Sequence, residues 1–231
     1  MNDFTIILRS LTSRLFSTLT TIVTVAVAVG LMLVLLSMRD AGRQAFERGS
    51  GNMHLLIGPG GSSPLVTVLN SVFYANPPPR PISWQQYEKI ASSFPLEFAI
   101  PTQQGDSYLG FPVMATKPEF FSQFVPQEGE KWSLASGAFF TKPFEVVVGS
   151  SVARATGLKI GDQVYLTPGI AQSRQLGAPT DMQPHVHKEF AYSVVGVLRP
   201  TGSSHDRAIF TDLISSWTIH AHDKRKAADP T

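Results

Sequence analysis

The chain has 231 residues, of which 43% are hydrophobic and 16% are charged, and its formal net charge is +2. It contains no cysteine, which excludes a disulfide framework and thiolate metal sites. The positive charge is too small and too evenly spread for a nucleic-acid surface, so we expect no nucleic-acid partner. Apart from one apolar segment, roughly 190 residues remain for folded domains, enough for one domain or two small subdomains.

That apolar segment runs from Leu15 to Met38 and contains no Asp, Glu, Lys or Arg. A helix with a rise of about 1.5 Å per residue would be about 36 Å long over this run, enough to cross a hydrocarbon core of about 30 Å. The sequence therefore predicts a transmembrane helix at 15–38. The alternative is a cleaved signal peptide, but the apolar core of a signal peptide is usually only about 7–15 residues long.

The residues on either side of this segment predict its orientation. Residues 1–14 form a stub too short for a domain, whereas a long soluble region follows, and such regions cross membranes largely regardless of flanking charge. We therefore expect a cytoplasmic stub, a single pass through the inner (cytoplasmic) membrane, and a main domain that is periplasmic or extracellular. Residues 39–49 are predicted to continue the helix as a stalk, because Ala41, Ala45 and Phe46 share one helical face.

Residues 50–222 are predicted to be an extracytoplasmic core domain of mixed short strands and helices. The capping box Ser83-x-x-Gln86 predicts the start of a helix, and Thr116-x-x-Glu119 predicts another. The expected elements of the first half are a strand at 54–57, helices at 65–73, 84–93 and 116–124, and strands at 99–100 and 108–115.

The second half of the core domain shows clearer patterns. Val194, Val195 and Val197 mark the strongest strand, and Gly157 is expected to end a short helix in the left-handed conformation. The expected strands are 145–148, 163–167, 190–198 and 208–211, the helices are 150–156 and 212–221, Pro168–Pro184 is a long loop, and 223–231 is a polar tail. The order of these elements predicts an α+β fold, with two subdomains in the core domain, and not a parallel doubly wound sheet.

No sequence motif predicts catalysis. The one Gly-rich loop, Gly58–Ser63, lacks the lysine of a phosphate-binding loop, and the chain contains no Gly-Lys pair. A G-x-S-x-G nucleophile motif is also absent from the sequence. We therefore expect neither an enzyme nor intrinsic ATP hydrolysis.

The histidines are the only candidate metal ligands that stand out. Five of the six follow Pro184, and an extended backbone would place His185 and His187 on one face, where both rings could bind zinc. His205, His220 or His222 would have to supply further ligands. The alternative is that these histidines are solvated or hydrogen-bonded locally, and no other cofactor is expected.

Several segments together resemble a known family. The most specific are Val148-Gly149-Ser150 through Ala153, the Gly157…Gly161-Asp162 turn, and Phe190…Val197 leading to Thr201-Gly202…Asp206-Arg207. With the apolar segment and stalk, they resemble the first half of an ABC transporter permease of the FtsX/MacB/LolE type, meaning span one and the extracytoplasmic core domain. These residues are read as scaffold residues, with Asp206 capping or bracing a turn.

The resemblance implies a permease subunit, or an N-terminal fragment of one, in an ATP-driven transport or mechanotransmission complex. Its implied partners are an ABC ATPase subunit, a second permease subunit in a homo- or heterodimer, and the lipid bilayer. The stalk Asp40–Arg48 and the loops Gly58–Ser63 and Pro168–Pro184 would then transmit motion or engage substrate or a partner protein. The alternative is a membrane-anchored binding module that captures a metal ion or a partner without ATP coupling.

Overall fold

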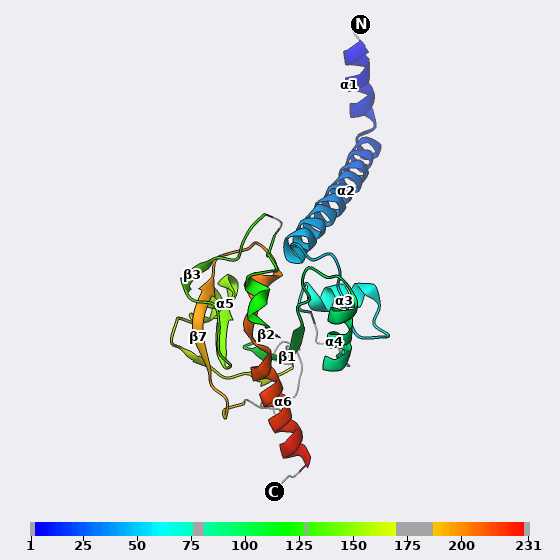
Figure 1. Ribbon diagram of the computed structural model, residues 1–231. Coiled ribbons are helices and arrows are strands. Elements are labelled where there is room, and N and C mark those ends of the chain that lie inside the picture. The colour runs from blue at the N-terminus through cyan, green and yellow to red at the C-terminus, as the bar shows by residue number, and fades with distance from the viewer. Residues whose placement is uncertain (1–2, 76–80, 128, 170–186, 229–231) are drawn as a thin grey trace. The chain divides into compact units, whose positions relative to one another are not determined.

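The computed structural model describes residues 3–75, 81–127, 129–169 and 187–228 (Figure 1). The chain divides into two compact units, residues 1–44 and 45–231. The finer division predicted above, into stub, span, stalk, core domain and tail, stays a prediction, as do the two subdomains within the core.

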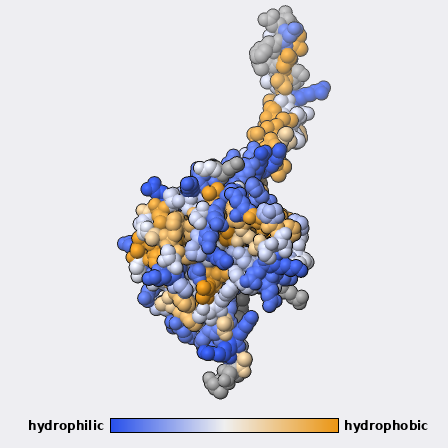
Figure 2. Space-filling model, in the orientation of Figure 1, coloured by the Kyte–Doolittle hydropathy of each residue, from blue (hydrophilic) through white to orange (hydrophobic). Residues whose placement is uncertain are grey.

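The first unit is helical. Helix α1 covers Asp3–Ser13, and helix α2 covers Leu15–Ser50 and therefore continues into the second unit. Among the described residues α2 is the one helix long and apolar enough to cross a membrane, and none of its apolar window is buried within the chain. Hydrophobic side chains cover its first turns and hydrophilic ones the later turns (Figure 2). As expected, the helix continues without a break from the apolar run through residues 39–49.

The second unit is built on a mixed sheet. Within the described residues the sheet has eight strands, in the order β3-β7-β4-β8-β2-β1-β6, with β5 also paired to β7. The β4–β7 and β2–β8 pairs are parallel and the other pairs antiparallel. The strand bounds are Thr102–Tyr108 (β1), Phe111–Thr116 (β2), Leu134–Gly137 (β3), Glu145–Val148 (β4), Gln163–Val164 (β5), Thr167–Pro168 (β6), Tyr192–Leu198 (β7) and Ile209–Asp212 (β8).

Short helices surround the sheet. Ser63 caps α3 by accepting a hydrogen bond from the Val66 amide, and the predicted capping box at Ser83 and Gln86 is formed at the start of α4. Gly157 ends α5 in the left-handed conformation, with φ at 74°, as expected. The helices are α3 (Pro64–Ser71), α4 (Trp84–Ser93), α5 (Ser150–Thr156) and α6 (Leu213–Ala228), with 3₁₀ turns η1 (Pro118–Phe121) and η3 (Ser204–Arg207). The predicted α+β fold is confirmed.

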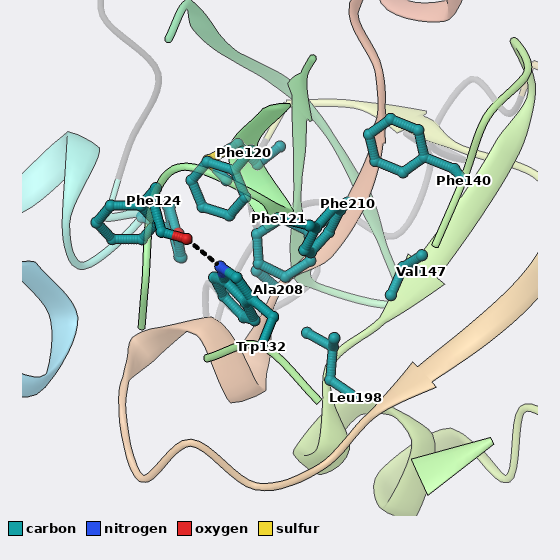
Figure 3. Packing of buried hydrophobic residues seen from close by; sticks show 11 residues of the cluster. Phe120, Phe121, Phe124, Trp132, Phe140, Val147, Leu198, Ala208 and Phe210 are labelled. Atoms are coloured by element: carbon teal, nitrogen blue, oxygen red, sulfur yellow. Dashed lines mark hydrogen bonds between the residues drawn. The ribbon is translucent and has the colours of Figure 1, made fainter. Parts of the chain in front are cut away.

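The two faces of the sheet carry different cores because neighbouring strand residues point to opposite sides. Val147 and Phe210 lie in an aromatic core, whereas Val148 and Ile209 lie in an aliphatic one. The aromatic core gathers Tyr74, Met114, Phe120, Phe121, Phe124, Trp132, Phe140, Val147, Leu198, Ala208 and Phe210. Figure 3 shows its rings packed edge to face and stacked, with Trp132 Nε1 donating to the Phe124 carbonyl at 2.8 Å.

Several predicted elements of the first half are wrong. The predicted strand 54–57 is not paired with any of the described strands, and its Leu55 and Ile57 side chains are exposed. Residues 99–100 precede β1 instead of forming a strand. The predicted strand 108–115 corresponds largely to β2, but it begins too early, because Leu109 and Gly110 adopt positive φ, 48° and 80°, and form the tight two-residue turn between β1 and β2.

The second predicted capping box is also wrong. Thr116 lies in β2, where its hydroxyl donates to the Pro101 carbonyl at 3.0 Å, and only the 3₁₀ turn η1 follows it. The predicted strand 163–167 is split into β5 and β6. Helix α6 continues to Ala228, through most of the predicted polar tail. Residues 170–184 of the predicted loop lie outside the described residues.

Candidate functional site

The end of α2 is inserted into the second unit. Gly49 is buried, and a Cβ at this position would lie 2.9 Å from Val72 Cγ1. A Cβ on Gly202 would lie 3.0 Å from the Arg48 guanidinium. At Gly49 a side chain would crowd Val72, so glycine allows the close approach of the helix end, whereas at Gly202 the positive φ of 68° favours glycine. We call this region, made by Gly49, Gly51, Asn52, Tyr74 and His205, the helix joint.

Gly51 and Asn52 continue the joint immediately after the helix. Gly51 has a φ of 50°, and a Cβ there would lie 1.8 Å from the Val125 carbonyl oxygen. The Asn52 side chain accepts from the Val125 amide at 3.0 Å and donates to the Gln123 carbonyl at 2.9 Å. The chain leaving α2 therefore packs closely on Gln123–Val125, the segment that follows η1.

His205 lies at the centre of the joint, 2% exposed and surrounded by aromatic rings. Its Nε2 lies 3.1 Å from the Gly49 carbonyl oxygen, and its Nδ1 lies 2.5 Å from the Tyr74 hydroxyl. Burial lowers the pKa of His205 to about 4, so the ring is neutral near pH 7. Burial likewise raises the pKa of the Tyr74 hydroxyl, which stays protonated. Tyr74 reaches the ring from a left-handed backbone conformation, with φ at 55°.

The loop that carries His205 is braced by Asp206. Asp206 Oδ1 accepts from the Thr201 amide at 2.8 Å and from its hydroxyl at 2.9 Å, and Oδ2 accepts from the Gly202 amide at 2.9 Å. The Ser204 hydroxyl donates to the Val72 carbonyl. The expected bracing role of Asp206 is therefore confirmed, and the segment Thr201–Asp206 presents His205 to the helix end.

A second group of polar residues lies between β1 and α6. The β1–β2 ladder is irregular between Gln104 and Asp106, and a Cβ on the intervening Gly105 would lie 3.1 Å from His220 Cε1. This bulge lets α6 approach β1 closely. His220 Nδ1 accepts from Gln103 Nε2 at 3.1 Å, and His220 Nε2 lies 3.8 Å from Asp106 Oδ1. Trp217 Nε1 donates to Gln103 Oε1 at 2.8 Å, which fixes the orientation of that amide.

The Asp106 carboxyl group in this polar group has a shifted pKa. Burial raises the pKa of its carboxyl group, and His220 and His187 oppose that shift. Asp106 Oδ1 and the Tyr192 hydroxyl have no hydrogen-bond partner within the part of the chain that the structure describes. Burial also raises the pKa of Tyr192.

The predicted histidine ligands are only partly brought together. His187 is 1% exposed and its Nδ1 lies 3.6 Å from Asp223 Oδ1, while His222 Nδ1 lies 3.8 Å from the same oxygen. His205 is engaged in the helix joint instead. His185 lies outside the described residues. Within the described ranges, no group of three or more His, Cys, Asp or Glu side chains is placed to hold a metal ion.

Sequence reasoning missed the helix joint. It assigned Gly49 to the end of the stalk and treated His205 as a possible extra zinc ligand. A signal was present in Thr201-Gly202…Asp206, whose spacing suits a braced turn. The partners of His205 are 131 and 156 residues away in sequence, so no local pattern could identify them.

Comparison with known families gives one match. The family model of the MacB-like periplasmic core domain matches residues 18–227. No curated protein matches the chain significantly. The family match covers most of the chain, including α2 from within its apolar run and the whole sheet. It thus includes both the helix joint and the β1–α6 polar group. The chain belongs to the family of proteins with a MacB-like periplasmic core domain, which is typical of ABC permease subunits.

Proposed function

We propose that this chain is a permease subunit, or the N-terminal part of one, in an ATP-driven ABC transport or mechanotransmission complex. The observation that carries the proposal is the family match over residues 18–227. The apolar run of α2 supports it, because a permease subunit must be held in the membrane. The proposed location is the inner membrane, with the domain on the periplasmic or extracellular side.

The proposed mechanism is mechanical. A separate ATPase subunit would bind and hydrolyse ATP, a second permease subunit would complete a homo- or heterodimer, and the external domain would engage substrate or a partner protein. Motion of the span would reach that domain through α2, which is one unbroken helix from Leu15 to Ser50. A continuous hydrogen-bonded helix transmits displacement along its axis better than a flexible linker would.

Isolation of the complex tests this proposal. The tagged full chain is crosslinked in membranes of its native host, extracted in detergent and analysed for bound proteins and ATP hydrolysis. We expect a P-loop ATPase to co-purify, and hydrolysis to disappear when the phosphate-binding lysine of that ATPase is replaced. The control is the same preparation from cells that lack the ATPase gene. Recovery of the chain without any ATPase would contradict the proposal.

A second and lesser proposal is zinc binding by His185 and His187 in a membrane-anchored binding module. The observation that favours it is the carboxylate of Asp223 beside His187, since a carboxylate is a third ligand type that zinc accepts. Calorimetric titration of the full chain with zinc, with a His185→Ala/His187→Ala double variant as control, tests it. Binding no tighter than about millimolar, or unchanged in the double variant, would contradict zinc as a physiological ligand.

A further inference from the structure

The helix joint has a chemical requirement that the family match does not explain. The last four carbonyl groups of an α-helix have no partner within the helix, and a buried one needs a donor from elsewhere. The Met53 amide bonds the Ser50 carbonyl, so it does not serve Gly49. His205 Nε2 is within hydrogen-bond distance of the Gly49 carbonyl oxygen, at 3.1 Å.

The partners of His205 determine where its proton lies. A carbonyl oxygen can only accept, so Nε2 must carry the hydrogen that bonds Gly49. A neutral imidazole has one N–H, which leaves Nδ1 as an acceptor for the Tyr74 hydroxyl at 2.5 Å. The Gly49 carbonyl therefore fixes the tautomer, and the Tyr74 hydroxyl, which can donate or accept, donates to the remaining bare Nδ1. A histidine so arranged in an aromatic cage satisfies both ring nitrogens, whereas an unbonded one would be costly to bury.

We propose that His205 is the positioning residue that caps the end of α2 through the Gly49 carbonyl, with the Tyr74 hydroxyl bonding its other ring nitrogen, so that the last turn of α2 and the sheet move as one body. This inference rests on the proposed function, because a rigid joint matters for coupling only if α2 moves. The loop braced by Asp206 places the ring, and β8 follows that loop directly. Displacement of the helix end would therefore reach the middle of the sheet, where β8 lies between β4 and β2.

Two variants with similar polarity separate this role from simple packing. In His205→Gln the amide nitrogen lies about as far along the side chain as Nε2, so it can still donate to Gly49. In His205→Asn the amide reaches only about as far as Nδ1, so the bond to Tyr74 can persist while the bond to Gly49 is lost. Asn leaves a larger space than Gln in the aromatic cage, so a packing role would predict a loss that spreads into the surrounding core, whereas loss of the cap is confined to residues 46–50.

The experiment measures amide hydrogen exchange of the full chain in lipid nanodiscs without any ATPase. For residues 46–50 we expect exchange at least about fivefold faster in His205→Asn than in the unmodified chain, and within about twofold of it in His205→Gln, since one hydrogen bond contributes about 1 kcal/mol. Amides of β4 and β8 should be unchanged in both.

Each other outcome overturns the inference. Equal exchange in the two variants, or faster exchange in β4 and β8 as well as in residues 46–50, would make His205 a packing residue. A second measurement uses ¹⁵N NMR of the imidazole near pH 7, where a protonated Nε2 and a bare Nδ1 are expected. Tyr74→Phe should keep Nε2 protonated, because the Gly49 carbonyl remains its acceptor. A protonated Nδ1 in the unmodified chain would contradict the cap. Because no ATPase is present, these results do not depend on whether the transport complex exists.

Discussion

The aromatic and aliphatic faces of the sheet bury their polar groups in different ways. On the aromatic face, His205 has hydrogen-bond partners for both ring nitrogens, at 2.5 and 3.1 Å. On the aliphatic face, Asp106 pairs across β1 and β2 with Val113, and its nearest histidine nitrogen is 3.8 Å away. The buried histidine of the aromatic face therefore has close partners for both ring nitrogens, whereas within the described residues Asp106 Oδ1 on the aliphatic face has no hydrogen bond and only a longer charge interaction with His220. The comparison shows that the two faces satisfy their buried polar groups to different extents.

The largest expected effect comes from removing an aromatic side chain beside His205. Phe210 is fully buried and its ring stacks on Phe120 at 5.5 Å between centroids. We expect Phe210→Ala to lower the free energy of unfolding by about 4 kcal/mol, because a large cavity remains. The corresponding truncation on the other face, Ile209→Ala, removes fewer buried atoms and should cost about 3 kcal/mol. Chemical denaturation of the full chain in detergent measures both, and equal losses would remove the distinction between the two cores.

Replacing a glycine of the helix joint by alanine should destabilise the fold more than the same replacement in an open glycine turn. In Gly51→Ala the new Cβ would overlap the Val125 carbonyl oxygen at 1.8 Å, on a backbone with positive φ. We expect a loss of at least about 3 kcal/mol from overlap and strain. Gly157→Ala is the control, because φ there is also positive but no atom lies within 4 Å of the Cβ. It should cost about 1 kcal/mol, and a similar loss at both positions would argue against a tightly packed joint.

Acid should weaken the aromatic face. The pKa of His205 is lowered by burial to about 4, so between that value and about 6.5 the unfolded chain binds a proton that the folded chain does not. Stability is therefore lost as pH falls through this window. From about pH 7 to pH 4.5 we expect His205 to contribute a loss of about 2 kcal/mol. The measurement is the free energy of unfolding against pH, compared with His205→Gln, which lacks the titrating ring and should show a flatter profile.

The smallest expected effect is the contribution of Asp106, on the aliphatic face, to the pH dependence of stability. Its sign is opposite to that of His205. Burial raises the pKa of Asp106, so the folded chain holds this proton more tightly than the unfolded chain does. Its contribution to stability is therefore present at acidic pH and is lost as pH rises above the ordinary range of a carboxyl group. Asp106→Asn should remove this dependence while keeping the side-chain shape. A profile that steepens in the variant would contradict the assignment.

Local sequence patterns determined much of the architecture. The uncharged run 15–38 and the helical spacing after it predicted α2, because helix length and hydropathy are properties of consecutive residues. The same holds for α4, whose capping box joins residues three apart, and for α5 with its terminal Gly157. The α+β class followed from the order of such elements.

Only the tertiary structure decided which distant residues meet. Strand β1 was missed because Gln103, Gln104 and Gly105 have little intrinsic preference for a strand, and pairing with β2 and β6 holds them there. The role of His205 depends on Gly49 and Tyr74, more than 100 residues earlier in the chain. A histidine in a sequence is compatible with a metal ligand, a solvated side chain or a buried cap. The folded surroundings decide which of these three roles the histidine has, because they set its burial and the hydrogen-bond partners of its two ring nitrogens.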